Sequence, residues 1–261
     1  MSLFQGVQRL ASEIGFSVQL LFLTISRLVH VPKRRVQLAA QLYGAGNKVL
    51  HVVLLVSFVM GMVISLQTGI VLAQYGQQDQ IGIVVAVTMA REMGPFITAI
   101  ILAATVASAI AAEIGTMSVS DELAALEVLS IDRTSYLVMP RVVAITLMAP
   151  LLTIFADSVG IVGGAFVARS QLGVSPALYF DSAIEALQTP AQLIGLPKDV
   201  YGGLIKSMVF GLTVSIIACA SGLRARGGAL GVGNATRSAV RDSIIAIIVL
   251  NYFLTWLFYQ A

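Results

Sequence analysis

Two side chains of opposite charge stand next to each other in a long apolar stretch of this 261-residue chain. Arg91 and Glu92 lie within the segment VTMAREMGPF, just before Gly94 and Pro95. A charge in an apolar medium is costly unless it is paired, and such charges usually face a cavity. Proline has no N–H, so the carbonyl of Arg91 loses its helical hydrogen bond beside the two charges. The segment therefore offers polar groups for binding a charged ligand.

Adjacent residues of a helix point about 100° apart, so Arg91 and Glu92 cannot both face one partner. We expect each to find its partner on another segment. The candidate partners in apolar surroundings are few, namely Asp157, Lys206, Arg237 and Arg241. Lining of a cavity and a purely structural role are nearly equal alternatives for the pair.

Motifs for catalysis, nucleotide binding and metal binding are missing from the sequence. The segment GGLIKS, residues 202–207, lacks the spacing of a phosphate-binding loop, so any ATP must be bound by another chain. No Ser–Lys, paired-Asp or HExxH arrangement occurs in the apolar segments. His30 and His51 have no ligand-like neighbours, and the single Cys219 excludes an internal disulfide. We predict that the chain is not an enzyme and holds no metal or cofactor itself.

The composition is that of an integral membrane protein. Hydrophobic residues make up 57% of the chain and charged residues 11%, against about 25% charged residues in a typical soluble domain. The mean hydropathy is +0.91. The basic residues are not gathered in one solvated region, so the net charge of +3 does not indicate nucleic-acid binding.

Five segments are long and apolar enough to cross a bilayer, which takes about 20 residues in a helix. Residues 1–48 precede them, and their apolar side chains recur every three or four positions, which predicts a helix at the membrane interface followed by a basic elbow. The periodic residues are Leu3, Val7, Leu10, Ile14, Val18, Leu21 and Ile25. The five predicted spans, which form a permease-like domain over 49–261, are 49–73, 81–112, 137–168, 203–221 and 238–259.

Lysine and arginine are distributed unevenly between the two sides that these spans define. One side, which includes the N-terminus, carries twelve of them, and the other carries Arg169, Lys198 and Lys206. Because basic residues concentrate on the cytoplasmic side, we predict a cytoplasmic N-terminus and an external C-terminus.

Small side chains recur at every fourth position in four of the spans. This spacing lets helix backbones approach closely in a membrane. We interpret the four series as packing sites within one bundle, with a dimer interface as an alternative. The series are Ser57, Gly61, Ser65, Gly69; Ala99, Ala103, Ala107, Ala111, Gly115; Ala156, Gly160, Gly164, Ala168; and Gly203, Ser207, Gly211, Ser215.

The segment 113–133, between the second and third spans, is amphipathic. Ser118 and Asp121 fit a helix-capping pattern. Leu123, Leu126 and Leu129 form an apolar stripe, and the other face carries the acids Asp121, Glu122, Glu127 and Asp132. Two interpretations remain open: a solvated connecting helix, or a short helix presented to a cytoplasmic partner.

Several motifs together resemble the MlaE family of ABC-transporter permeases, which work with MCE-domain proteins. The similarity runs from about residue 40 to the C-terminus. The motifs, in the order of the family, are REMGP (91–95), AEIGTM (112–117), DELAALEVL (121–129), PR (140–141), GLIKSMVFGLTVS (203–215) and ATRSAV (235–240). One position departs from the family pattern, because Thr105 stands where an arginine is usual, so no role of that arginine is carried over.

The resemblance implies an all-α membrane protein, a homodimer in the bacterial inner membrane, with a periplasmic C-terminus. It implies a cytoplasmic ATPase that binds ATP and Mg²⁺, an MCE-domain protein outside, and in some members a STAS-domain protein. The substrate would be a phospholipid or a related lipid. Residues 116–131 would be the helix that couples the permease to the ATPase, with the coupling residues Glu113, Asp121, Glu122, Leu123, Leu126 and Glu127.

On this basis we predict a lipid cavity in the outer half of the membrane. Its lining would come from the charged pair and from the first span: Arg91, Glu92, Leu66, Gln67, Thr68 and Leu72. Arg237, at the inner end of the fifth span, is a candidate for binding an anionic headgroup at the cytoplasmic leaflet, and an ordinary basic residue of the cytoplasmic side is the favoured alternative. Two other functions stay as alternatives. One is a membrane scaffold that anchors MCE and ATPase subunits without forming the lipid path. The other is an ion channel or proton-coupled carrier, for which Asp157 and Glu92 are the available acids.

Overall fold

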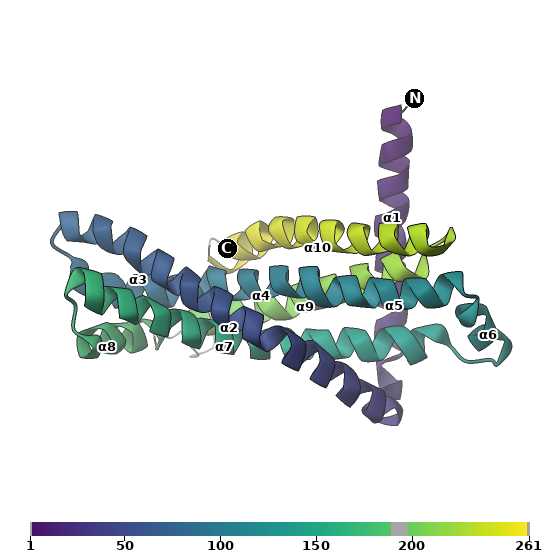
Figure 1. Cartoon of the computed structure of the whole chain (residues 1–261), viewed down its shortest axis with the longest axis horizontal. Coiled ribbons are helices and arrows are strands. Elements are labelled where there is room, and N and C mark those ends of the chain that lie inside the picture. Colours follow the sequence, from purple (N-terminus) through teal and green to yellow (C-terminus); the bar gives the residue numbers. More distant parts are fainter. Residues whose placement is uncertain (1, 189–197, 260–261) are drawn as a thin grey trace. The chain divides into compact units, whose positions relative to one another are not determined.

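A computed structural model of the chain describes residues 2–188 and 198–259, and for residues 2–11, 30, 32 and 33 it describes the backbone alone. Every regular element in these two ranges is a helix (Figure 1). The all-α membrane class predicted from the composition is therefore confirmed.

Five helical stretches are long and apolar enough to cross a membrane, as predicted, and all are longer than the predicted spans. They run over 35–74, 78–119, 134–172, 198–223 and 228–259. The first of these five stretches begins at Arg35 rather than near residue 49. Its backbone hydrogen bonds continue through polar residues that a hydropathy limit excludes from the predicted span. The basic elbow shrinks to the 3₁₀ helix Leu28–Arg34.

The second stretch is assembled from several shorter helices with two π-helical turns between them, and the third begins with a π-helical turn that leads into one long α-helix. In chain order the elements are α1 (Ser2–Ser26), η1 (Leu28–Arg34), α2 (Arg35–Gln74), η2 (Gln78–Gln80), α3 (Ile81–Thr88), η3 (Met89–Met93), α4 (Gly94–Leu102), η4 (Ala103–Ala107), α5 (Ser108–Val119), α6 (Glu122–Val128), η5 (Thr134–Val138), α7 (Met139–Leu172), α8 (Pro176–Leu187), α9 (Lys198–Leu223) and α10 (Gly228–Tyr259).

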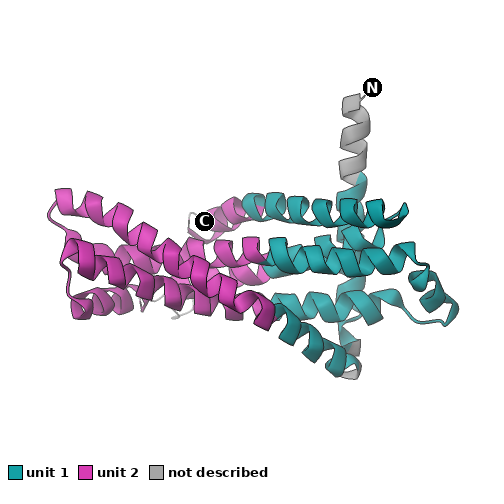
Figure 2. Cartoon of the chain, in the orientation of Figure 1, with its two compact units in different colours: residues 1–45, 102–147, 211–249 teal, residues 46–101, 148–210, 250–261 magenta. Residues whose placement is uncertain are grey.

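The chain divides into two compact units (Figure 2). Unit 1 comprises residues 1–45, 102–147 and 211–249, and unit 2 comprises residues 46–101, 148–210 and 250–261. Each of the long helices α2, α7, α9 and α10 contributes residues to both units.

In unit 2, the small-residue series of α2 and α7 pack against each other. A side chain at Gly61 would collide with the carbonyl of Gly160. One turn further along, the Ser65 hydroxyl donates a hydrogen bond of 2.9 Å to the carbonyl of Gly164. The interpretation of these two series as packing sites within the bundle is confirmed.

Replacing Gly61 with alanine is expected to lower the stability of the fold by about 1–3 kcal/mol, because the added methyl group must push two backbones apart. A side chain added at Gly44, on the same helix, would meet no other described atom within 4 Å, so Gly44→Ala should be neutral or slightly stabilising through helix propensity. Thermal unfolding of the two purified variants in detergent measures the difference. Equal unfolding temperatures would contradict close α2–α7 packing.

A second core in unit 2 lies between α3 and α8. Ile81, Val85 and Met89 pack on Tyr179 of α8, which has no exposed surface. The Tyr179 hydroxyl donates a hydrogen bond of 3.0 Å to the carbonyl of Ile161. Burial raises the pKa of this phenol, so it keeps the proton that it donates. Tyr179 thereby holds α3, the helix that precedes η3, against α7 and α8.

In unit 1, helix α1 has an apolar face that the rest of the unit leaves uncovered. Ile14 is 64% exposed and Phe22 66% exposed, whereas Leu20 is buried on the opposite face. Its C-terminal Arg27 forms an ion pair of 3.2 Å with Asp132. This amphipathic character matches the predicted interfacial helix, and the membrane placement stays a prediction. The side chains of Leu3, Val7 and Leu10 lie outside the described residues.

Candidate functional site

The charged pair of the second span lies on a π-helical turn. In η3 the hydrogen bonds reach one residue further than in an α-helix, and the Gly94 N–H bonds the carbonyl of Met89. The wider turn carries both Arg91 and Glu92. Turns of this kind inside α-helices are frequent at functional sites.

Glu92 is held by α9 and α10 within unit 2. Its Oε1 lies 2.6 Å from Nζ of Lys206, a lysine with no exposed side-chain surface. The Asn251 amide donates to Oε2 at 3.1 Å, and the Thr255 hydroxyl lies 2.9 Å from Oε1. The prediction that Lys206 is a partner of this pair is confirmed.

Helix α9 also covers the backbone that Pro95 opens. Nζ of Lys206 donates to the carbonyl of Arg91 at 3.3 Å, which is the carbonyl left without its helical donor. A side chain at Gly203 would collide with the carbonyl of Ala90. The absence of a side chain at Gly203 therefore lets α9 approach the π-turn closely enough for Lys206 to reach it.

Arg91 pairs with a residue that the sequence prediction missed. A single oxygen of Asp199, Oδ1, accepts from Nε of Arg91 at 2.9 Å and lies 2.8 Å from its Nη2. The guanidinium also stacks over the ring of Tyr259, 4.3 Å from its centroid. The predicted fourth span begins at residue 203 and leaves Asp199 outside it, whereas α9 begins at Lys198. One more helical turn brings Asp199 into the site.

We call this group the charge cluster: Arg91, Glu92, Asp199, Lys206, Asn251, Thr255 and Tyr259. It pairs two cations with two carboxylates between helices of mainly apolar composition. The ion pairs are unequally open, because the side chain of Lys206 has no exposed surface and that of Arg91 is 37% exposed. Arg91 is therefore the charge that an external ligand can reach.

The other candidate lipid-binding residues make no hydrogen bond or ion pair with the charge cluster in the described structure. Leu66 and Gln67 are exposed on α2, and Thr68 is half-buried. Leu72 packs against the α3–α8 core. Arg237 belongs to unit 1, where it bonds Asn234 at 2.7 Å.

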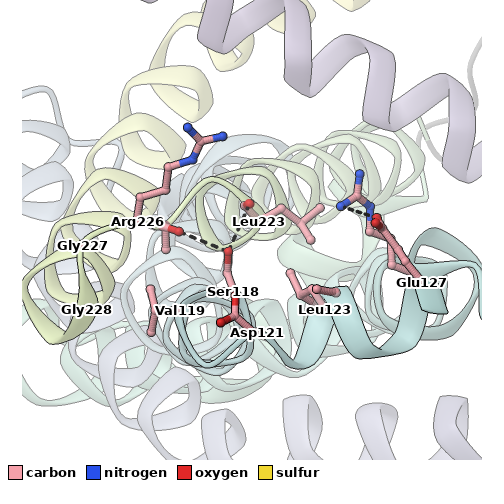
Figure 3. A pocket seen from close by; sticks show the side chains of 12 residues that line it. Ser118, Val119, Asp121, Leu123, Glu127, Leu223, Arg226, Gly227 and Gly228 are labelled. Carbon is pink, nitrogen blue, oxygen red and sulfur yellow. Dashed lines mark hydrogen bonds and ion pairs between the residues drawn. The ribbon is translucent and has the colours of Figure 1, made fainter. Parts of the chain in front are cut away.

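In unit 1, the segment between the second and third spans is helical over a shorter range than predicted. Helix α5 continues to Val119, and α6 covers Glu122–Val128 instead of 116–131 (Figure 1). The predicted capping pattern is wrong. Asp121 adopts a left-handed conformation with φ 60° and makes no capping hydrogen bond. The Ser118 hydroxyl instead donates to the carbonyl of Ala225 at 3.1 Å, after the end of α9 (Figure 3).

Helix α6 turns one leucine inward and leaves apolar side chains outside. Leu123 is 6% exposed, whereas Val128 is 85% and Leu129 is 68% exposed. A cavity of about 410 Å³ lies beside α6, between it and the turn that follows α9 (Figure 3). Asp121, Glu122 and Glu127 are exposed, and Glu127 pairs with Arg133 at 2.9 Å.

Glu113, also predicted to take part in coupling, lies on α5 before this segment. Its Oε2 is 2.9 Å from Nη2 of Arg141 on α7. Arg141 is 8% exposed and also donates to the carbonyl of Leu137 at 3.0 Å. The ion pair thus joins the two helices that flank α6.

Comparison with known proteins agrees with this architecture. The family described as Permease MlaE matches residues 38–257. The chain belongs to the MlaE permease family. A probable ABC transporter permease protein of Synechocystis sp. is 38% identical over 242 residues, which are 92% of this chain and 89% of the relative. One of Rickettsia prowazekii is 36% identical over 252 residues, 97% of this chain and 94% of the relative.

A plant protein is also similar to this MlaE-family permease. Arabidopsis thaliana protein TRIGALACTOSYLDIACYLGLYCEROL 1, chloroplastic, is 39% identical over 220 residues, which are 84% of this chain and 61% of the relative. Together with the five apolar helices, these matches make the chain a multi-pass membrane subunit of ABC-transporter type.

Proposed function

We propose that this permease is the membrane subunit of an ATP-driven phospholipid transporter, and that the charge cluster is where a lipid headgroup engages it. The cluster carries the proposal, because it places a reachable arginine beside a buried, charge-balanced set of polar groups in an apolar unit. A phosphate group is an anion that an arginine binds through two hydrogen bonds. The name of the Arabidopsis relative includes the name of a glycolipid, which is consistent with a lipid substrate.

Headgroup binding would proceed by exchange of partners. A phosphate that approaches the exposed edge of Arg91 competes with Asp199, while the buried Lys206–Glu92 pair keeps the π-turn in place. The exposed apolar side chains of α2, such as Leu66 and Ile70, then offer contact for the acyl chains. Lipid movement of this kind breaks no covalent bond, so the permease needs no catalytic residue.

We further propose the assembly in which this movement occurs. Two copies of the permease span a bacterial inner membrane with the N-terminus cytoplasmic, as the distribution of basic residues indicates. An ATPase subunit, which binds ATP and Mg²⁺, docks on α6. An MCE-domain protein receives or delivers lipid on the periplasmic side, and a STAS-domain protein joins the ATPase in a variant of the assembly.

Mass spectrometry of the complex extracted intact from its native membrane tests this assembly. Two copies of the permease with an ATPase, MCE chains and bound phospholipid are the expected result. The same subunits without lipid would favour a scaffold that leaves the lipid path to other chains. The permease without an ATPase would overturn the proposal.

Removing the reachable charge is expected to slow lipid transfer. Arg91→Ala should lower the transfer rate in a reconstituted complex by roughly 10–100-fold, since a hydrogen bond to a charged group contributes about 1.5–3 kcal/mol. Arg169→Ala is the matched control, because Arg169 is an exposed arginine of unit 2 outside the cluster. An assembled Arg91→Ala complex that moves lipid at the wild-type rate would contradict headgroup binding at this site.

A further inference from the structure

One enclosed carboxyl oxygen of unit 2 has no partner among the described residues. Asp157 lies near the middle of α7, in the third apolar stretch. Its Oδ1 is enclosed and makes no hydrogen bond, and in the described structure the side chain forms no ion pair. An ionisable group in this position is expensive in a membrane and points to a bound ligand or a binding function.

The two cations of the charge cluster are already engaged with other acids. Arg91 is held by Asp199, and Lys206 is held by Glu92. The charge cluster is therefore neutral without Asp157. An ionised Asp157 would add a negative charge that no cation of the cluster balances.

Asp157 lies directly against the π-turn. A side chain on Gly94 would collide with Oδ1 of Asp157 and would lie 3.2 Å from the carbonyl oxygen of Met89. Two acceptor oxygens, one from the carboxyl group of Asp157 and one from the backbone of the π-turn, therefore lie beside Gly94. Backbone carbonyls of interrupted membrane helices are groups that bind Na⁺ or a proton in transport proteins.

Four further enclosed oxygens without hydrogen-bond partners belong to the same unit. Oδ1 of Asn251 and the hydroxyl of Tyr259 are part of the charge cluster, and the other two are Oγ of Ser57 and Oγ1 of Thr98. Thr98 follows Gly94 by one helical turn on α4, and the backbone of Ser57 contacts Gly160, nearly one turn after Asp157 on α7. Buried polar groups in folded proteins are nearly always satisfied, so the orphan oxygens of Asp157, Ser57 and Thr98 call for an explanation.

We propose that Asp157 binds a small monovalent cation, a proton or a sodium ion, between α7 and the π-turn. The cation neutralises the carboxylate, and its site adjoins Gly94, the residue that ends the turn carrying Arg91 and Glu92. Occupancy of the site is thereby linked to the geometry of the charge cluster. This inference is independent of the lipid proposal, because it concerns the charge of Asp157 whatever substrate the permease moves.

The charged and titratable groups of the elements packed on this part of α7 are few. Helix α2 brings Lys48 and His51 within unit 2, η3 brings Arg91 and Glu92, and α8 brings Asp181, Glu185 and Tyr179. Lys48 and His51 are exposed. Neither they nor the engaged Arg91 form an ion pair with Asp157 in the described structure.

The test measures the cation and the carboxyl group separately, in the full chain reconstituted in lipid nanodiscs. Infrared spectra with isotope-labelled aspartate report whether a protonated carboxyl group is present at neutral pH in sodium-free buffer. Thermal unfolding is followed as Na⁺ replaces choline at constant ionic strength. Asp157→Asn removes the charge with little change of shape, and Asp181→Asn, at an exposed position on α8, is the matched control.

The two cations give different results. If the ligand is a proton, the protonated band is present in the wild type and in Asp181→Asn and is lost in Asp157→Asn. The wild-type unfolding temperature then falls relative to Asp157→Asn as pH rises, because the folded protein must give up its proton. If the ligand is sodium, Na⁺ raises the wild-type unfolding temperature to a plateau, and Asp157→Asn abolishes the rise.

A failure to fold does not end the test. If Asp157→Asn does not fold, Thr98→Val keeps the carboxyl group and removes a neutral oxygen. It should weaken the Na⁺ response in the sodium case and leave the protonated band unchanged in the proton case. An ionised Asp157 in sodium-free buffer, together with an unfolding temperature that Na⁺ does not change, would overturn the proposal.

Discussion

Replacing Lys206 with methionine is expected to destabilise the permease by roughly 3–5 kcal/mol, the usual loss when one partner of a buried ion pair is removed. Methionine fills a similar volume but leaves the carboxylate of Glu92 without a cation in an apolar unit. It also leaves the carbonyl of Arg91 without the donor that replaces the missing N–H of Pro95. Both losses fall on the same π-turn.

Thermal unfolding in detergent measures this effect, with Lys48→Met as the matched control. Lys48 is an exposed lysine of α2 in unit 2, outside the charge cluster. The double variant Lys206→Met/Glu92→Gln should regain a large part of the lost stability, because the two changes remove the buried charges together. If Lys206→Met unfolds at the same temperature as Lys48→Met, the pair does not stabilise the fold.

The number and class of the helices could be predicted from the sequence because hydropathy acts over whole segments. Five apolar stretches of sufficient length produced five membrane-length helices. The ends could not be predicted as well, because a hydropathy limit ends a span at its first polar residues while the backbone continues its hydrogen bonds. Asp199 was missed for this reason, although it lies only four residues before the predicted start of the fourth span.

Partners could be predicted where the choice was small. Lys206 was one of four candidate partners for the charged pair. The missing N–H of Pro95 also indicated that the carbonyl of Arg91 would lack its helical donor. The π-helical form of the turn could not be predicted, since the missing N–H of Pro95 indicates which carbonyl loses its donor but not how the neighbouring hydrogen bonds shift. The capping pattern at Ser118 failed for a related reason, because a carbonyl in the turn after α9 offered its hydroxyl a tertiary partner.

Changing the exposed apolar residues of α6 should separate ATPase binding from folding. Val128→Asp and Leu129→Asp are each expected to weaken binding of the ATPase subunit by roughly 30-fold, which corresponds to about 2 kcal/mol for the loss of a central contact residue. The reason is exposure: these two side chains have no partner in the described structure, whereas Leu123 is already packed within unit 1.

Co-purification of the ATPase and the ATPase rate of the reconstituted complex measure the effect. Tyr75→Asp is the control, because it places the same charge at an exposed residue near the end of α2, on the side that the distribution of basic residues assigns to the periplasm. Leu123→Ala should behave differently. It should lower the unfolding temperature through loss of core packing, and it should leave ATPase affinity close to that of the wild type in the folded fraction.

The contrast between inward and outward residues decides between the two interpretations of this segment. A solvated connecting helix tolerates a charge at an exposed position such as Val128, so both aspartate variants would then bind and activate the ATPase as the wild type does. A docking helix does not, because the partner's groove must desolvate the new carboxylate. Loss of binding with an unchanged unfolding temperature would therefore assign coupling to the exposed residues at the end of α6, Val128 and Leu129, rather than to Leu123, which belongs to the same predicted leucine stripe but is buried.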